Sequence, residues 1–184
     1  MIIIGITGTL GAGKGTIVDY LVGEKKYNHF SVRSYLLERI TLKGLPGNRD
    51  SMVQVANELR KNNSPSYIVD QLFEQALSSG TNAVIESIRT PGEVESLKNK
   101  GKFYLFAVDA EPTIRYHRIV LRNSETDKVN YQTFLENEKR EMTSNDPNKQ
   151  NLSRCREMAD YILENNKSIP DLIDQVNEIL KKIR

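Results

Sequence analysis

The residues with the clearest chemical potential lie near the start of the chain. An apolar run, Met1 to Thr7, is followed by Gly8-Thr9-Leu10-Gly11-Ala12-Gly13-Lys14-Gly15-Thr16 and then by a stretch with helical character. Glycines let the backbone N–H groups of a tight loop approach an anion without a Cβ in the way. The following helix N-terminus adds partial positive charge, and the Lys side chain adds a mobile cation for outer phosphates. The segment therefore predicts a phosphate-binding loop made of Gly8, Gly11, Ala12, Gly13, Lys14, Gly15 and Thr16.

Charged side chains also follow later apolar runs. Glu86 ends the run that begins at Ala83, Arg89 comes three residues later, and Arg33 follows Val32. Ligands of an open parallel sheet bind beyond the carboxyl ends of its strands, so we expect these side chains beside the phosphate loop. There Glu86 can orient the water ligands of a magnesium ion or accept a proton from a substrate. Arg89 can bind a phosphate through two parallel hydrogen bonds.

Three arginines share one face of a predicted helix that starts near Pro112. Arg115, Arg118 and Arg122 are spaced three and four residues apart, and the last of them leads into a polar stretch. Phosphoryl transfer needs positive charge on the group that moves, and arginines of a mobile lid supply it. We therefore predict catalytic roles for Arg118 and Arg122 in a lid at about 119–145. A solvated helix face is the alternative for all three arginines, and Arg115 suits it best.

A further set of polar residues lies between the second and third apolar runs, in a helical excursion of about 33–79. Arg49, Gln54 and Arg60 fall on one predicted helix of this excursion. Two arginines and an amide suit an anionic substrate that carries a base, so these residues and Arg33 are predicted to bind the substrate. A solvated helix is the alternative interpretation of the same pattern.

Other candidates for chemistry are weaker. Asp109 ends an apolar run and is an equally good cap for the loop that follows it. His29 and His117 lack the spacing of a metal site, and we interpret both as structural. Cys155 is the single cysteine, with no histidine near it in sequence, so neither an internal disulfide nor a nucleophilic thiol is expected.

Along the chain, apolar runs typical of strands alternate with stretches of helical character. This alternation is the pattern of a parallel sheet covered on both faces, which would bring the candidate site residues together. We predict an α/β fold of three layers with five parallel strands, in a single domain spanning 1–184. The predicted strands are 1–7, 29–32, 82–86, 103–109 and 159–163. The predicted helices are 13–23, one that starts at 31 or 33 and ends near 42, 49–61, 66–79, 93–100, 112–122, 131–142, a short one ending near 157, and 169–183.

Composition limits the partners. The formal net charge of +2 gives no argument for a nucleic-acid partner. No apolar run approaches the length of a membrane span, so no membrane partner is predicted. A lone cysteine fits a reducing cytosol, which predicts a cytoplasmic location. The pattern leaves monomer and homodimer open.

The motifs together resemble a known group of enzymes. The order Gly8-x-x-Gly11-x-Gly13-Lys14-Gly15-Thr16 resembles the loop of the adenylate kinase group, and the segment from Val84 to Glu93 resembles the stretch that reads Asp-Gly-Phe-Pro-Arg-Thr-x-x-Gln there. The spacing of the three lid arginines is similar to that group, and residues 49–60 look like deoxynucleoside monophosphate kinases. Residues 159–165 are similar to dephospho-coenzyme A kinases and archaeal-type nucleotide kinases. Glu86 and Ser87 stand where the group has Asp and Gly, and the proline before Arg89 is missing.

This resemblance implies the P-loop NTPase fold and an ATP- and magnesium-dependent transfer of a phosphoryl group. Magnesium would be held mainly by water and phosphate, near Thr16 and Glu86. The implied acceptor is a small nucleotide, a nucleoside or deoxynucleoside monophosphate. Two alternatives remain open: transfer to a ribose hydroxyl, as in dephospho-coenzyme A kinases, and an adenylate-kinase-like ATPase that serves as an assembly factor or switch.

Overall fold

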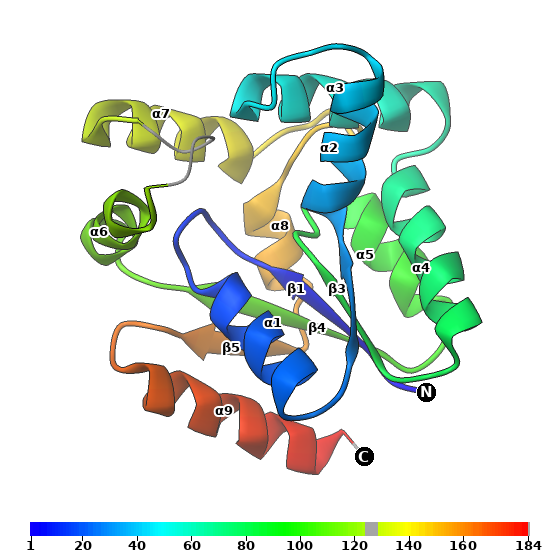
Figure 1. Ribbon diagram of the computed structural model, residues 1–184, viewed down its shortest axis with the longest axis vertical. Helices are drawn as coiled ribbons and strands as arrows, with labels where there is room; N and C mark the ends of the chain where they lie inside the picture. Colours follow the sequence, from blue (N-terminus) through cyan, green and yellow to red (C-terminus); the bar gives the residue numbers. More distant parts are fainter. Residues whose placement is uncertain (124–128, 184) are drawn as a thin grey trace.

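The computed structural model describes residues 1–123 and 129–183 and alternates strands with helices (Figure 1). The strands are β1 (Ile3–Thr7), β2 (Asn28–Ser31), β3 (Ala83–Glu86), β4 (Phe103–Asp109) and β5 (Tyr161–Glu164). The helices are α1 (Lys14–Gly23), α2 (Val32–Leu42), α3 (Arg49–Asn62), α4 (Tyr67–Ser79), α5 (Pro91–Lys98), α6 (Pro112–Arg122), α7 (Tyr131–Met142), α8 (Leu152–Glu157) and α9 (Ile169–Lys182).

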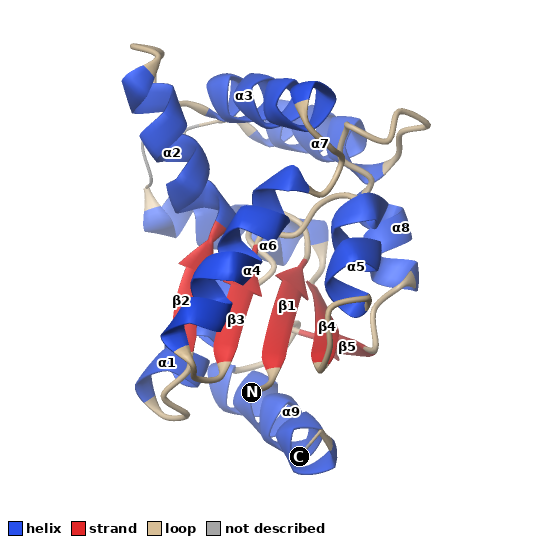
Figure 2. Ribbon diagram, turned by 90° about the vertical axis from the view of Figure 1, so that its right-hand side faces the viewer, coloured by secondary structure: helices blue, strands red, loops and turns tan. Residues whose placement is uncertain are grey.

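The five strands form one parallel sheet, as predicted, and their order is β2-β3-β1-β4-β5. In register, Ile6 of β1 lies opposite Glu86 of β3, which in turn lies opposite Ser31 of β2. All carboxyl ends therefore meet at one edge, and Figure 2 shows the strand arrowheads pointing toward the end of the molecule where α2, α3 and α7 lie. The topology brings the phosphate loop after β1 and the loop after β3 side by side.

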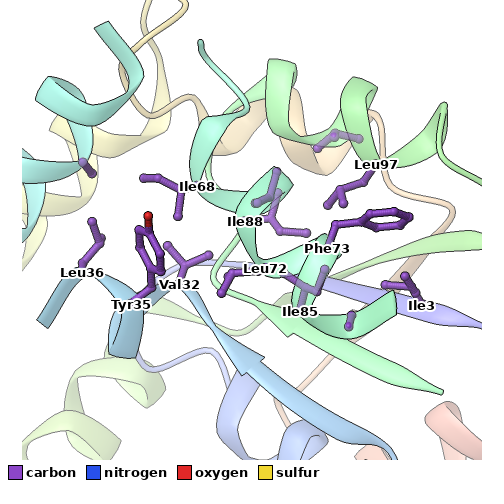
Figure 3. Packing of buried hydrophobic residues seen from close by; sticks show 14 of the residues in the cluster. Ile3, Val32, Tyr35, Leu36, Ile68, Leu72, Phe73, Ile85, Ile88 and Leu97 are labelled. Atoms are coloured by element: carbon purple, nitrogen blue, oxygen red, sulfur yellow. The ribbon is translucent and has the colours of Figure 1, made fainter. Parts of the chain in front are cut away.

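Side chains that alternate along β1 enter two separate cores. Ile4 and Ile6 pack with α1 and α9 on one face. Ile3 packs on the other face with α2, α3, α4, α5 and α8, in the cluster of Figure 3. Because both faces are covered, the central strands β1, β3 and β4 are apolar over most of their length rather than alternating, whereas the edge strand β2 is polar and partly exposed. Gly5 belongs to the second face, where a Cβ would come within 2.5 Å of the Phe103 ring.

Most predicted boundaries are confirmed, and the exceptions have local causes. Val32 is helical rather than the last residue of β2, because the Ser31 side chain accepts a hydrogen bond from the backbone N–H of Ser34 and so caps α2. The helix expected from residue 93 begins at Pro91, since Thr90 and Glu93 form a capping box before it. Residues 159 and 160 precede β5 instead of belonging to it.

The two predicted excursions meet above the carboxyl edge of the sheet. Helices α2, α3 and α4 make up the excursion of 33–79, and α6 with α7 make up the described part of the predicted lid. Residues 124–128 of that lid lie outside the described residues. In both ribbon views α7 lies beside α3, where Arg49 and Asp50 of α3 form ion pairs with Glu141 and Arg140 of α7. Among the described helices, none has the length and apolar character required to cross a membrane.

Candidate functional site

The phosphate loop joins β1 to α1 in a conformation that depends on glycine. Gly13 is the residue before α1 and has φ 111°. A Cβ added there would lie 2.1 Å from the side-chain nitrogen of Asn165, and one added at Gly11, where φ is 79°, would lie 2.5 Å from the carbonyl oxygen of Arg115. These values of φ are strained for any other residue. The loop therefore holds its backbone N–H groups at the N-terminus of α1, where an anion is favoured.

Lys14 folds back over this loop. Its Nζ donates hydrogen bonds of 2.8 Å to the carbonyl oxygens of Gly8 and Thr9. The residue as a whole is half-buried, but its ammonium group is surrounded by protein. The pKa of Lys14 is lowered to about 7, mainly by burial of the ammonium group. The positive charge of Arg89 also lowers this pKa, and its effect is larger than the opposite effect of the Glu86 carboxylate. A phosphate placed in the loop would supply the negative charge that this ammonium lacks.

Glu86, at the end of β3, points its carboxylate into the same space. Oε1 accepts a hydrogen bond of 2.8 Å from the Ser31 hydroxyl, and Oε2 accepts one of 3.2 Å from the Ser87 hydroxyl. Ser87 has φ 68°, a conformation that favours glycine, and the resembling kinases have glycine there. The two hydroxyl groups fix the carboxylate while leaving its remaining lone pairs for metal-bound water or a substrate hydroxyl.

Two arginines from distant segments converge on one carboxylate. Arg49, at the start of α3, donates from Nε and Nη2 to Oε1 of Glu141, at 2.9 and 2.6 Å. Arg89, in the loop after β3, donates from Nη1 to Oε2 of Glu141 at 2.7 Å and to the side-chain oxygen of Gln150 at 2.9 Å. Burial acts to raise the pKa of Glu141, but both arginines oppose it and hold that pKa below its usual range.

Arg60 lies at the far end of α3, and its side chain is 1% exposed. Its guanidinium donates to Oε1 of Glu93 at 3.1 and 2.7 Å, and Oε2 of Glu93 accepts the backbone N–H groups of Arg89 and Thr90. Glu93 therefore joins α3 to the loop that carries Arg89. Nη1 of Arg60 is buried and has no hydrogen-bond partner among the described residues. Such a donor costs about 1–3 kcal/mol unless water or a ligand meets it.

The three arginines of α6 take three different positions. Arg115 is buried, contrary to a solvated helix face, and pairs with Glu138 of α7. Arg118 donates to the carbonyl oxygen of Asn165 at 2.9 Å, which attaches it to the turn between β5 and α9. Its Nη1 is buried without a partner among the described residues. Arg122 is exposed at the end of α6.

One cavity of about 640 Å³ gathers most of these groups. Among the described residues its walls contain seven basic and three acidic side chains, whereas the whole chain has a net charge of only +2. Of the predicted site residues, the cavity is lined by Gly11, Gly13, Lys14, Gly15, Thr16, Arg33, Arg49, Arg60, Glu86, Arg89, Arg118 and Arg122. Gly8 and Ala12 do not line the cavity, but they stabilise the loop. The carbonyl oxygen of Gly8 accepts a hydrogen bond from Lys14, and that of Ala12 accepts one from Asn165.

Gln54 does not line this cavity, and its predicted contact with the substrate stays a prediction. It is exposed on α3, and helical geometry gives the reason. At 100° per residue, Gln54 points about 140° away from Arg49, while Arg60 returns to within about 20° of it. Asp109 likewise lies elsewhere: it accepts from the backbone N–H of Ala110 at 2.9 Å and pairs with Arg156 at 2.8 Å, as a loop cap.

Sequence reasoning missed several residues that shape the cavity: Glu141, Gln150, Asn165 and, behind it, Glu93. Asn165 enters the sequence analysis only through the resemblance of residues 159–165, yet its side chain donates to the carbonyl oxygen of Ala12 at 2.8 Å and secures the phosphate loop. Its place after the last strand, at the same sheet edge as the loop, was a usable signal. Glu93 was also identifiable, because Thr90-x-x-Glu93 before an apolar stretch is a capping box.

The donor set fits a nucleoside triphosphate with hydrated magnesium. The loop offers backbone N–H groups and one lysine, and the hydroxyl of Thr16 and the carboxylate of Glu86 line the same cavity. Oxygen ligands of this kind suit magnesium that keeps several waters and binds phosphate oxygens. Among the described residues there is no group of three or more His, Cys, Asp and Glu side chains that could hold a metal ion alone. Arg118 also lines the cavity, and its buried Nη1 has no hydrogen-bond partner in the described part of the chain.

The sheet order and the loop after β1 define a P-loop NTPase fold, which this chain shares with solved structures of small-molecule kinases. TT1252 from Thermus thermophilus has a TM-score of 0.62 to this chain at 19% identity, covering 100% of this chain and 98% of that one. A shikimate kinase from Acinetobacter baumannii in complex with shikimate has a TM-score of 0.60 at 17% identity, covering 100% and 93%. A gluconokinase from Sinorhizobium meliloti 1021 has a TM-score of 0.61 at 13% identity, covering 99% and 93%.

Within this class, a family model described as an AAA domain matches residues 4–146, and the chain belongs to that family. The chain is also similar along its whole length to several archaeal proteins that are all named UPF0200 protein. The UPF0200 protein of Methanococcus vannielii is 29% identical over 186 residues, covering 100% of this chain and 97% of the relative. The UPF0200 protein MJ1399 of Methanocaldococcus jannaschii is 27% identical over 188 residues, covering 100% and 91%.

Proposed function

We propose that the protein is an ATP- and magnesium-dependent phosphotransferase whose acceptor is a nucleoside or deoxynucleoside monophosphate. The observation that carries this proposal is the charge of the cavity, with seven basic against three acidic side chains around a phosphate loop. Such an excess of positive charge favours polyanionic ligands in both halves of the cavity. Lys14 belongs to the half that would bind the phosphoryl donor, ATP. Arg49 and Arg89 belong to the half that would bind the phosphoryl acceptor.

On the donor side, the loop N–H groups and Lys14 bind the phosphates of ATP. Arg118 and Ile169 both line the cavity, and Arg118 donates to Asn165, whose side chain in turn donates to the Ala12 carbonyl of the phosphate loop. An apolar side chain and a guanidinium plane provide a surface on which a purine ring can stack. We therefore assign Arg118 to the donor nucleotide, in addition to the part in lid closure that the sequence suggests.

On the acceptor side, Arg49 and Arg89 bind the phosphate of the monophosphate. A wall of apolar side chains extends from them along α2 and α3 toward Arg60, made of Val32, Leu36, Met52, Val53 and Ala56. A planar base fits an apolar wall with a single polar group at its end. The unpartnered Nη1 of Arg60 is available to a hydrogen-bond acceptor atom of that base.

The chain's own residues then act as follows. The γ-phosphoryl group leaves the β-phosphate oxygen of ATP and is taken by a phosphate oxygen of the acceptor. Lys14 stabilises the negative charge that develops on the transferring group and on the ADP that leaves, and Arg122 closes over the same group from the end of α6. Glu86, fixed by two hydroxyl groups, would hold a hydrated magnesium ion through its water ligands, and that ion would neutralise charge on the phosphates. Closure of α6 and α7 excludes water and limits hydrolysis.

A ribose hydroxyl is the second candidate acceptor, as in dephospho-coenzyme A kinases. It is favoured by one observation: the hydrogen-bond donors on the Glu86 carboxylate are serine hydroxyls, at 2.8 and 3.2 Å. A carboxylate held in this way can take the proton of an attacking hydroxyl, a step that a phosphate acceptor does not need.

The test is a screen of magnesium-dependent ATP consumption with each ribonucleoside and deoxynucleoside monophosphate and with dephospho-coenzyme A. We expect one monophosphate, or a closely related pair, to stimulate ADP production strongly and to appear as a diphosphate. Phosphorylated dephospho-coenzyme A would select the second candidate. Slow ATP hydrolysis that no acceptor stimulates would refute both, and would favour a nucleotide-dependent switch or assembly factor.

A further inference from the structure

We propose that Glu141 is a specificity residue: its carboxylate holds the anion position of the acceptor site and yields it to a phosphate but not to another carboxylate. This proposal rests on the proposed function in one respect, because it assumes that Arg49 and Arg89 face the acceptor. It adds that the site discriminates between anionic groups, and it assigns that discrimination to one side chain of α7.

The geometry around Glu141 is that of a bound oxyanion. One oxygen accepts two hydrogen bonds from Arg49, at 2.9 and 2.6 Å, and the other accepts one from Arg89, at 2.7 Å. The Glu141 side chain is 4% exposed, and those of Arg49 and Arg89 are 14% and 18% exposed. All three groups lie in the wall of the cavity that contains the phosphate loop. A charged carboxylate therefore occupies the place where an acceptor phosphate would receive the same donors.

The neighbouring carboxylate of α7 shows that this position is distinctive. Glu138 lies one turn earlier and also pairs with an arginine, Arg115, but neither of those two side chains lines the cavity. The pair of Glu138 serves to dock α7 on α6. Glu141 instead joins α7 to two cationic side chains that the ligand-binding cavity shares.

Competition between anions follows from this placement. A carboxylate on an incoming ligand offers the arginines nothing that Glu141 does not already offer, and Glu141 competes as a tethered group at high effective concentration. A phosphate brings three acceptor oxygens and a charge of roughly −1.5 to −2, so it makes more and stronger charge-assisted hydrogen bonds. Glu141 thus weakens the binding of every anionic ligand, and it weakens the binding of carboxylates most. The site gains specificity for phosphate because it excludes its competitors.

The experiment compares two base-free polyols in the absence of ATP: ribose 5-phosphate and gluconate. Their affinities are measured by calorimetry at constant ionic strength for the natural protein, Glu141→Gln and Glu138→Gln. We expect the natural protein to prefer ribose 5-phosphate. In Glu141→Gln, gluconate affinity should rise about tenfold or more, as expected when a charge-assisted hydrogen bond becomes available, and the preference should fall accordingly. Glu138→Gln is the matched control, and it should keep the natural preference.

Several results would overturn the proposal. An unchanged ratio of the two affinities in Glu141→Gln would do so, as would a parallel loss of both, which is the signature of a carboxylate that merely positions the arginines. Absence of binding of either polyol to every variant would overturn it as well. Arg89→Met in the Glu141→Gln background must abolish the gained gluconate binding, because otherwise the gain arises elsewhere. Failure of the proposed function would appear instead in the acceptor screen, with the binding selectivity intact.

Discussion

Binding of ATP should be coupled to protonation of Lys14, and this coupling gives the sharpest test of the site. In the ligand-free protein, burial lowers the pKa of Lys14 to about 7 from an ordinary value of 10.5. Triphosphate oxygens beside Nζ would restore the charged form. If only the charged form binds tightly, affinity must fall as the pH rises above 7.

The magnitude follows from the fraction of Lys14 that is charged. That fraction is about one half at pH 7 and about one hundredth at pH 9, so the affinity for ATP should fall about fiftyfold over this range. At pH 8 the phosphates of ATP are already ionised, since their last pKa lies near 6. Binding at pH 8 should therefore take up close to one proton from the buffer, and that proton resides on Lys14.

The assay is calorimetry of ATP binding at pH 8 in buffers of different ionisation enthalpy, whose slope gives the number of protons taken up. Lys14→Met supplies the control and should give a value near zero with a flat pH profile between 7 and 9. A natural protein that takes up no proton, or that loses affinity with pH no faster than Lys14→Met, would refute this account of the site.

The same lowered pKa has a consequence for stability, and its sign is fixed. The unfolded chain keeps the Lys14 proton up to pH 10.5, whereas the folded protein releases it near 7, so stability must rise with pH between these values. The penalty below pH 7 is of the order of 5 kcal/mol if the whole shift is realised. Lys14→Met should thus stabilise the ligand-free protein at pH 7, and its advantage in thermal unfolding should vanish toward pH 10.

Three further predictions test other parts of the structure. Glu93→Gln leaves the buried Arg60 without its carboxylate and should cost about 3–5 kcal/mol in urea unfolding, with Arg60→Met recovering part of the loss in the double variant. Gln54→Ala should leave the KM for the acceptor unchanged, whereas Arg89→Lys should raise it about tenfold, since a bidentate contact is lost; equal effects would return Gln54 to the site. Gly13→Ala should abolish ATP binding in calorimetry while the fold persists by circular dichroism, because a Cβ would meet a side-chain nitrogen at 2.1 Å.

The strands, the sheet edge and the phosphate loop could be predicted because each depends on residues close together in the chain. Apolar runs fix the strands, and the glycine spacing before Lys14 fixes the loop and the helix that follows it. Once the strands are parallel, the position of Glu86 after Ile85 is enough to place its carboxylate beside that loop. These are consequences of connectivity and hardly depend on details of packing.

Gln54 lies outside the cavity because helix geometry turns it away from the face of α3 that lines the cavity. Residues 49–60 look like a substrate-binding stretch of other kinases, and that likeness included Gln54. The rotation of about 100° per residue already separates Gln54 from the face that Arg49 and Arg60 share. Val53 and Ala56 complete that face in the structure, and both line the cavity. The helical period is therefore a better guide to the cavity-lining residues of α3 than the resemblance.

Glu141 could not have been selected from sequence. Helix α7 carries Glu136, Glu138 and Glu141 with similar neighbours, and nothing local distinguishes them. The partners of Glu141 lie 92 and 52 residues away, at Arg49 and Arg89. Only the docking of α7 against α3 decides which of the three acids enters the cavity.

Lys14 and Glu141 solve the same electrostatic problem by different means. A cavity built for phosphates must assemble cations before any phosphate arrives, and neighbouring cations in a partly buried site repel one another. At the loop the repulsion is relieved by proton release, because the pKa of Lys14 falls to about 7. Between Arg49 and Arg89 it is relieved by an internal carboxylate, that of Glu141. We expect a phosphate that binds at the loop to restore the proton on Lys14, and one that binds between the arginines to replace the carboxylate with a more highly charged anion.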